Sequence, residues 1–157
     1  MAAHTAGQPL YLDNLAVGDR FESGTLLVEA DEVRSFAARF DPQPFHLDEE
    51  AARTSVFGGL AASGWHTAAL TMRLLVESLP FGCGVIGAGT ELQWPRPTRP
   101  GDLLRVSTTV LDVAPSRSKA DRGIVTCRSE TLNQHGECVQ SMTARLLVLR
   151  RPQAATA

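Results

Sequence analysis

The sequence predicts a single α+β domain in which a curved antiparallel sheet wraps one long helix. Apolar residues recur at helical spacing in much of the first half, and from residue 85 onward they alternate with polar residues as in β-strands. The length of 157 residues suits one ordinary domain with a substantial core. A long buried helix followed by a run of antiparallel strands is typical of the α+β class.

The first half of the chain is expected to hold one strand and three helices. Residues 20–29 have the composition of a strand. A helix is expected to begin at Asp31, as its cap, and to end at Phe40, where its apolar stripe stops. Two prolines then forbid continuation, so residues 41–47 are expected to form a stiff loop.

The longest helix is expected over residues 65–79, and its apolar residues occupy most of its sides, as in a buried helix. A short helix over residues 49–54, capped by Asp48, precedes it. Gly64 lies at the start of the long helix and permits close approach of its N-terminus to another group. Four strands follow and are expected to form an antiparallel meander, at residues 85–94, 102–113, 123–132 and 139–149.

Composition excludes several classes of protein. A net charge of −2 offers no basic field for nucleic acid or an anionic membrane surface, and no stretch has the length and hydropathy of a membrane span. The three cysteines (Cys83, Cys127 and Cys138) suggest neither a disulfide framework nor a metal site. We therefore expect a cytoplasmic protein without a metal, whose domain covers residues 10–150 and whose tails are residues 1–9 and 151–157.

Residues 40–46 (FDPQPFH) resemble the signature loop of the MaoC-like, (R)-specific enoyl-CoA hydratase family, which reads roughly Asp-x-Asn-Pro-x-His. The resemblance continues in the same order through residues 57–65 (FGGLAASGW), 97–102 (PTRPGD) and 133–137 (NQHGE). It implies the hotdog fold and a hydro-lyase of fatty acid metabolism that needs no cofactor beyond the coenzyme A of its substrate. Two positions depart from the family, because Gln43 replaces the usual Asn and Ser63 a frequent His.

The resemblance assigns Asp41 and His46 to an acid/base pair that polarises one water and adds it to one face of an enoyl thioester. The two lie five positions apart across two prolines, so both side chains reach one water if the loop folds back. In isolation, Asp41 is more typical of a turn and His46 of a solvated loop; the joint motifs favour catalysis. The amide of Gly64, at the positive end of the long helix, is the expected donor to the thioester oxyanion.

Further residues are expected to contact the acyl-CoA substrate. Arg96, Arg117 and other basic loop residues, Arg99 among them, are available to its phosphates, although an ordinary solvated surface explains them equally well. His66 is a rival histidine, more typical of a structural role. The substrate-binding candidates are Gln43, Phe45, Gly59, Leu60, Ser63, Trp65, Arg96 and Arg117.

Two alternative functions share this fold. One is an acyl-CoA thioesterase, which would place a carboxylate in the helix region, and the other is a non-catalytic acyl-thioester binding protein, for which the departure at Gln43 is the main argument. Pairing of edge strands predicts a homodimer or a dimer of dimers.

Overall fold

The computed structural model describes residues 7–154, so the outermost parts of the expected tails, residues 1–6 and 155–157, lie outside the described residues. These residues form a six-stranded antiparallel sheet with the order β1-β4-β5-β6-β3, and β2 pairs separately with β4. The strands are β1 (Arg20–Glu22), β2 (Leu26–Leu27), β3 (Ile86–Gln93), β4 (Leu103–Pro115), β5 (Arg122–Leu132) and β6 (Cys138–Leu149).

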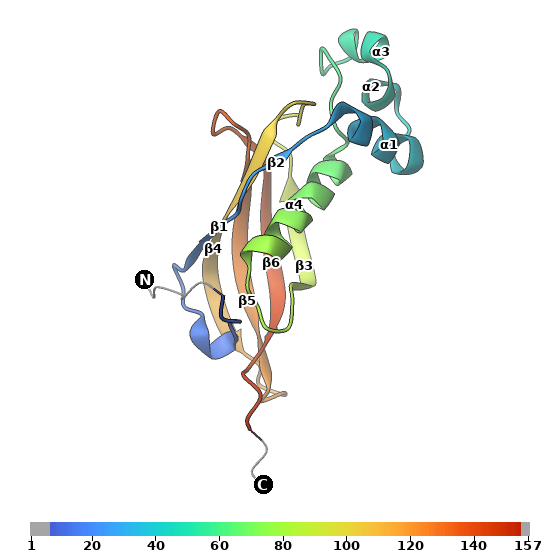
Figure 1. The fold of residues 1–157 in the computed structure, drawn as a ribbon. Coiled ribbons are helices and arrows are strands. Elements are labelled where there is room, and N and C mark those ends of the chain that lie inside the picture. The colour runs from blue at the N-terminus through green and yellow to red at the C-terminus, as the bar shows by residue number, and fades with distance from the viewer. Residues whose placement is uncertain (1–6, 155–157) are drawn as a thin grey trace.

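One long helix lies along a face of the curved sheet, and three short helices project beyond the end of the sheet at which the long helix begins (Figure 1). The long helix is α4 (Gly64–Ser78), and the others are a 3-10 turn η1 (Leu12–Asn14), α1 (Ala30–Phe40), α2 (Pro44–Leu47) and α3 (Glu49–Arg53). This is the hotdog arrangement, so the predicted α+β class and the predicted fold are both confirmed.

The core lies between α4 and the sheet. Along β4 the alternation predicted from the sequence buries Leu104, Val106 and Val110 almost completely. They belong to the same apolar cluster as Leu74 and Leu75 of α4. Each such side chain contributes about 1.5–3 kcal/mol through removal from water, so this layer fixes the helix on the sheet.

The predicted meander is wrong in one pairing. Strands β4, β5 and β6 do form consecutive hairpins, but β3 pairs with β6 instead of with β4, which follows it in the chain. The connection over residues 94–102 carries three prolines and is too long and stiff for a tight hairpin. It leads instead from one side of the sheet to a strand nearer the other, and β6 supplies the edge that β3 needs.

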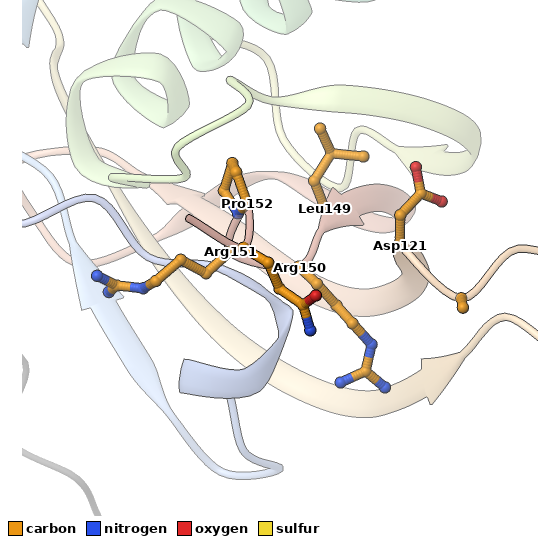
Figure 2. Close-up of a pocket in the computed structure, with 7 residues that line it drawn as sticks. Asp121, Leu149, Arg150, Arg151 and Pro152 are labelled. Atoms are coloured by element: carbon orange, nitrogen blue, oxygen red, sulfur yellow. The ribbon is translucent and has the colours of Figure 1, made fainter. Parts of the chain in front are cut away.

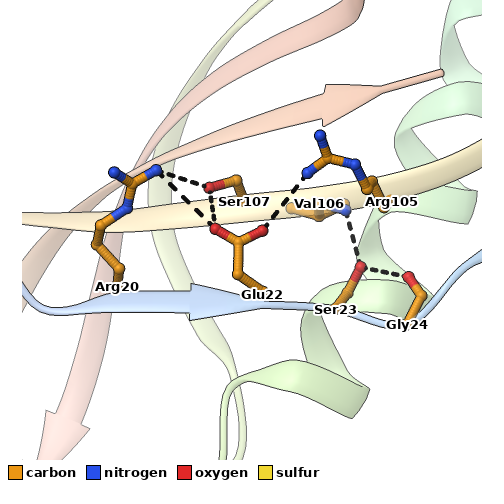
Figure 3. Close-up of polar contacts among 7 residues, drawn as sticks. All are labelled: Arg20, Glu22, Ser23, Gly24, Arg105, Val106 and Ser107. Carbon is orange, nitrogen blue, oxygen red and sulfur yellow. Dashed lines mark hydrogen bonds and ion pairs between the residues drawn. The ribbon is translucent and has the colours of Figure 1, made fainter. Parts of the chain in front are cut away.

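The single strand expected over residues 20–29 is broken into β1 and β2. At the break, the Ser23 hydroxyl accepts a hydrogen bond from the Val106 N–H at 2.8 Å and donates to the Gly24 carbonyl at 2.7 Å (Figure 3). The side chain thus takes a place in the ladder that a backbone carbonyl would otherwise fill. Beside it, Glu22 lies between Arg20 and Arg105, which holds β1 on β4 (Figure 3).

Two local expectations about the helices are also corrected. Helix α1 begins at Ala30, so Asp31 lies in its first turn, where the helix dipole favours its charge, and is not the cap. Residues 41–47 are not wholly a loop, because α2 forms one helical turn. Pro44 suits the first position of that turn, where no N–H is needed. The cap at Asp48 is confirmed by its bond from the Ala51 N–H at 2.8 Å.

Helix α4 is less buried than its sequence suggests. Trp65, Met72 and Val76 lie on a side that is open in the single chain, with 61%, 41% and 59% of their surfaces exposed. The side that packs on the sheet includes two threonines, Thr67 and Thr71, whose hydroxyls are paired with Thr98 and Thr131. An apolar periodicity alone does not show which side meets the sheet when small polar residues are paired in the core.

Candidate active site

The turn of α2 brings His46 back beside Asp41. Asp41 ends α1, and the short α2 helix reverses the chain so that His46 Nε2 lies 3.3 Å from Asp41 Oδ2. The imidazole is buried, with 4% of the residue exposed, whereas the carboxylate is about one fifth exposed. The structure therefore joins the two predicted residues at hydrogen-bonding range, with Asp41 on the accessible side.

The His46 tautomer follows from its second partner. Nδ1 lies 2.6 Å from the carbonyl oxygen of Ala61, and because a carbonyl only accepts, Nδ1 carries a proton. In neutral imidazole Nε2 is then an acceptor, like the facing Asp41 oxygen. Two acceptors at 3.3 Å suit a donor placed beside both, such as one water molecule.

Asp41 is held ionised by two neighbours. Gln43 Nε2 donates to Asp41 Oδ1 at 2.6 Å, and the Ser63 hydroxyl forms a second hydrogen bond. Burial is the largest single influence and raises the pKa of Asp41, but the hydrogen bonds from Gln43 and Ser63, together with the smaller effect of the neighbouring His46, outweigh it. The pKa therefore lies below its ordinary value of 3.8. Both departures from the family motif, Gln43 and Ser63, thus serve the same carboxylate.

Replacing Gln43 by Met is expected to raise the pKa of Asp41, because a donor to its charged form is lost while the side-chain length is kept. The pKa would be followed by the pH dependence of the Asp41 carboxyl carbon resonance in NMR spectra. Gln8→Met, at an exposed position away from α2, is the matched control and should leave that titration unchanged. An unchanged titration in Gln43→Met would show that Gln43 does not stabilise the carboxylate.

A cavity of about 390 Å³, here called the His46 cavity, opens beside this pair. Gly64 lies in its wall at the first turn of α4, and its N–H donates to no acceptor in the described part of the chain. A β-carbon at Gly64 would lie 2.8 Å from the Trp94 indole, so only glycine fits. The lining residues are Gln43, Phe45, His46, Phe57, Ala62, Gly64, Thr67, Trp94, Pro95, Arg96, Pro97 and Thr98.

Comparison with known proteins agrees with this geometry. A family model for the MaoC like domain matches residues 14–132. The chain belongs to the MaoC-like family. The solved structure of a MaoC-like dehydratase from Rhodospirillum rubrum is 67% identical, with a TM-score of 0.90, over 91% of this chain and 99% of that one.

Two curated relatives extend the comparison. The uncharacterized protein YdeM of Bacillus subtilis is 38% identical over 126 residues, which are 78% of this chain and 87% of YdeM. A 3-hydroxybutyryl-CoA dehydratase of Methylorubrum extorquens is 32% identical over 111 residues, 71% of this chain and 70% of the relative. The resemblance inferred from the four motifs is confirmed, and the MaoC-like family is one of hydratases and dehydratases.

Only some of the predicted substrate-binding residues line the His46 cavity. Gln43, Phe45 and Arg96 line it. Ser63 does not line it but interacts with Asp41, and Gly59 and Leu60 belong to a segment behind His46. The remaining two candidates, Trp65 and Arg117, do not line it.

Trp65 and Arg117 lie outside the His46 cavity for different reasons. The Trp65 ring is largely exposed on the open side of α4 and makes a T-shaped contact with Trp94 of the cavity wall, at 5.3 Å between centroids. Arg117 lies in the turn after β4, whereas the cavity is near the start of that strand. Thirteen residues of extended chain separate the two ends of β4 by about 40 Å.

Two residues shape the site in ways that the sequence did not predict. Trp94 follows β3 and covers Gly64, and its indole N–H donates to the buried Gln140 at 2.8 Å. Arg99 was considered for phosphate binding, yet its guanidinium donates to backbone carbonyls behind His46. An aromatic residue directly before a proline-rich connection was the available signal for Trp94; no local signal exists for the partners of Arg99.

His66, the rival histidine, does not line the His46 cavity. Its ring is buried on α4 and stacks on Phe36 at 4.7 Å between centroids, and its Nδ1 has no hydrogen-bond partner. Burial lowers the pKa of His66 below its ordinary value of 6.5, although the charge of Glu32 acts in the opposite direction. The side chain is therefore a neutral core group in this fold.

The free energy of unfolding is expected to fall as the pH drops below 6.5, because the unfolded chain then protonates His66 while the folded chain does not. His66→Phe should reduce this dependence, since it keeps the stacking on Phe36 without a titratable group. Urea unfolding at pH 7 and pH 5 measures the difference, with the exposed His135→Gln as control. Equal pH dependence in wild type and His66→Phe would contradict the buried neutral state.

The described part of the chain has other cavities besides the His46 cavity. A larger one, of about 460 Å³, lies at the other end of the sheet beside Leu149 and Pro152 (Figure 2). Its Arg150 is paired with Asp13, and Arg151 lies over the Tyr11 ring at 5.2 Å.

Among residues 7–154, no group of three or more His, Cys, Asp or Glu side chains is placed to hold a metal ion. Within the same range no helix has the length and hydropathy needed to cross a membrane.

Proposed function

We propose that this MaoC-like protein is an enoyl-CoA hydratase that adds water reversibly to a trans-2-enoyl thioester and gives the (3R)-hydroxyacyl thioester. The observation that carries the proposal is the pair of acceptors, Asp41 Oδ2 and His46 Nε2, 3.3 Å apart beside a cavity that contains the start of α4. The dehydratase name of a relative at 32% identity supports the same reaction class.

In this mechanism one water donates a hydrogen bond to each of Asp41 and His46, which turns its oxygen lone pair toward C3 of the substrate. The oxygen–C3 bond forms as one water proton passes to the pair, and the electrons of the double bond move onto the thioester oxygen. The pair then returns a proton to C2. Because both hydroxyl and proton come from the same side of the cavity, addition occurs on one face.

The developing enolate needs a donor at the thioester oxygen. The Gly64 N–H, which has no acceptor in the described chain, lies at the positive end of the fifteen-residue helix α4. A preorganised amide at such a place supplies about 3 kcal/mol of transition-state stabilisation. The absence of a side chain at Gly64 lets the thioester approach this amide.

For the remainder of the substrate, we propose a coenzyme A thioester whose phosphates meet Arg96 at the cavity mouth. Arg96 is about half exposed and is paired only loosely with Glu137, at 3.8 Å, so it is available to a stronger anion. We place the reaction in the cytoplasm and in fatty acid metabolism. The three cysteines are all unpaired, as a reducing compartment favours.

The direct test mixes the purified protein with crotonyl-CoA and follows the loss of the enoyl-thioester absorbance. Turnover with formation of 3-hydroxybutyryl-CoA of (3R) configuration, identified by chiral chromatography after hydrolysis, is the expected result. A panel of longer enoyl-CoA esters would define the acyl chain. Absence of turnover across the panel would overturn the proposal.

The thioesterase alternative is less well supported. Helix α4 carries no acidic residue in its first turn, and its one carboxylate, Glu77, lies near its far end and is paired with Arg73. Release of free thiol from acyl-CoA would reverse this ranking. A non-catalytic binding role predicts tight binding of acyl-CoA without turnover, but Gln43 now supports the carboxylate and no longer favours that role.

We also propose that two copies pair. Strand β3 is an edge of the sheet and is exposed along nearly its whole length, and the open side of α4 beside it presents Met72 and Val76. Pairing along β3 would cover both. Light scattering at micromolar concentration should give a dimer or a tetramer, and a monomer would contradict the proposal.

A further inference from the structure

Arg99, in the connection between β3 and β4, forms hydrogen bonds to the segment of chain behind His46. Its Nη1 donates to the carbonyls of Gly59 at 2.8 Å and Leu60 at 3.3 Å, and its Nη2 donates to the carbonyl of Phe57. Residues 57–62, here called the glycine segment, are thus held by one planar guanidinium. Such charge-assisted bonds are stronger than bonds between neutral groups.

The glycine segment has no regular structure to hold its own shape. It contains neither helix nor strand, and Gly58 adopts a φ of 64° that side chains rarely accept. Four of its backbone N–H groups also bond to residues outside the segment: Phe57 and Gly58 to Ser55, each at 3.1 Å, Ala62 to the Thr98 carbonyl at 2.9 Å, and Ala61 to the Phe45 carbonyl at 3.4 Å. The conformation of the segment therefore depends on its neighbours, and Arg99 is the side chain that binds three of its carbonyls.

This segment also fixes His46. The Ala61 carbonyl accepts the Nδ1 proton at 2.6 Å, and the Phe57 ring lies 6.0 Å from the imidazole and 5.1 Å from Phe45. Movement of the carbonyls at residues 57–60 would shift both the acceptor and the aromatic packing. The direction in which Nε2 points, toward Asp41, follows from this contact.

Arg99 is itself tied to the sheet. Its backbone N–H donates to Asp102 Oδ2 at 2.8 Å, and Asp102 Oδ1 accepts from Gln134 at 3.1 Å. Gln134 belongs to the turn between β5 and β6. The guanidinium therefore extends from a rigid part of the domain.

We propose that Arg99 is a positioning residue for the acid/base pair. It transmits the rigidity of the sheet to the glycine segment and so keeps His46 in the tautomer with the proton on Nδ1 and with Nε2 facing Asp41. Its effect on rate rests on the proposed hydratase function, whereas its effect on the imidazole does not.

The first test observes the imidazole alone. In protein labelled with ¹⁵N at histidine, His46 is expected to show a proton on Nδ1 in wild type and a mixture of tautomers in Arg99→Met. Arg99→Lys keeps the charge but lacks the planar guanidinium, so its proportion of the two His46 tautomers should lie between those of wild type and Arg99→Met. The same variant provides the test if Arg99→Met fails to fold. Arg128→Met, at an exposed arginine on β5, is the control and should match wild type. An unchanged His46 tautomer in the Arg99 variants would overturn the proposal.

The second test is kinetic. With crotonyl-CoA, kcat should fall by about tenfold to a hundredfold in Arg99→Met with KM nearly unchanged, because small misplacements of reacting groups have effects of that size. A raised KM with wild-type kcat would instead make Arg99 a ligand contact and overturn the positioning role. If wild type shows no turnover while the tautomer changes as expected, the hydratase function fails and the positioning role stands.

Discussion

Asp41→Asn is expected to lower kcat for enoyl-CoA hydration by about 10²–10⁴-fold while the protein remains folded. Asparagine has the same shape and still offers an oxygen to Gln43, but it lacks the charge that accepts a water proton. Stopped-flow or steady-state absorbance with crotonyl-CoA measures the loss. Asp31→Asn, at an almost fully exposed carboxylate on α1, is the matched control and should keep wild-type kcat.

The pair should also behave as a unit. If Asp41 and His46 act on the same water, the double variant Asp41→Asn/His46→Ala should be about as slow as the slower single variant, because removing either partner already abolishes the arrangement. If the fold-decrease in kcat of the double variant equals the product of the two single decreases, the two residues act in separate steps. Undiminished turnover in both single variants would remove them from the mechanism altogether.

Much of the fold could be predicted because its main signals are local. The helical spacing that ends at Phe40 and the alternation along β4 each lie within a dozen residues, and both elements form where they were expected. The pairing of β3 with β6 could not be predicted in this way. It depends on a choice between two distant strands, and that choice is made by the stiffness of the 94–102 connection and the available edge of β6.

The same distinction between local signals and long-range contacts applies to the candidate site. Asp41 and His46 could be brought together from the motif because they lie only five positions apart, and the single turn of α2 places them side by side. Trp94 and Arg99 lie 30 and 40 positions beyond Gly64 and Gly59, which they contact, so these contacts exist only once β3 has paired with β6. Arg117 could not be placed relative to the cavity, because membership of a loop does not reveal at which end of the sheet the loop lies.

The second large effect is expected at Gly64. Gly64→Val places side-chain atoms between the N–H at the start of α4 and the thioester carbonyl, and kcat should fall by about 10²–10³-fold, the usual effect of losing one oxyanion donor. The kinetics with crotonyl-CoA measure it, and circular dichroism reports on the fold. Gly24→Val, at a glycine with open space around its β-carbon position and no positive φ, is the control for the substitution itself.

Gly64→Val alone does not separate two causes, because its β-carbon would lie 2.8 Å from the Trp94 indole as well as beside the amide. The variant Trp94→Ala/Gly64→Val removes the indole and leaves room for the new side chain. If blocked access to the amide is the cause, kcat of this double variant should stay far below that of Trp94→Ala. If the two are equal, the glycine serves only to accommodate Trp94, and the oxyanion must be stabilised by another group.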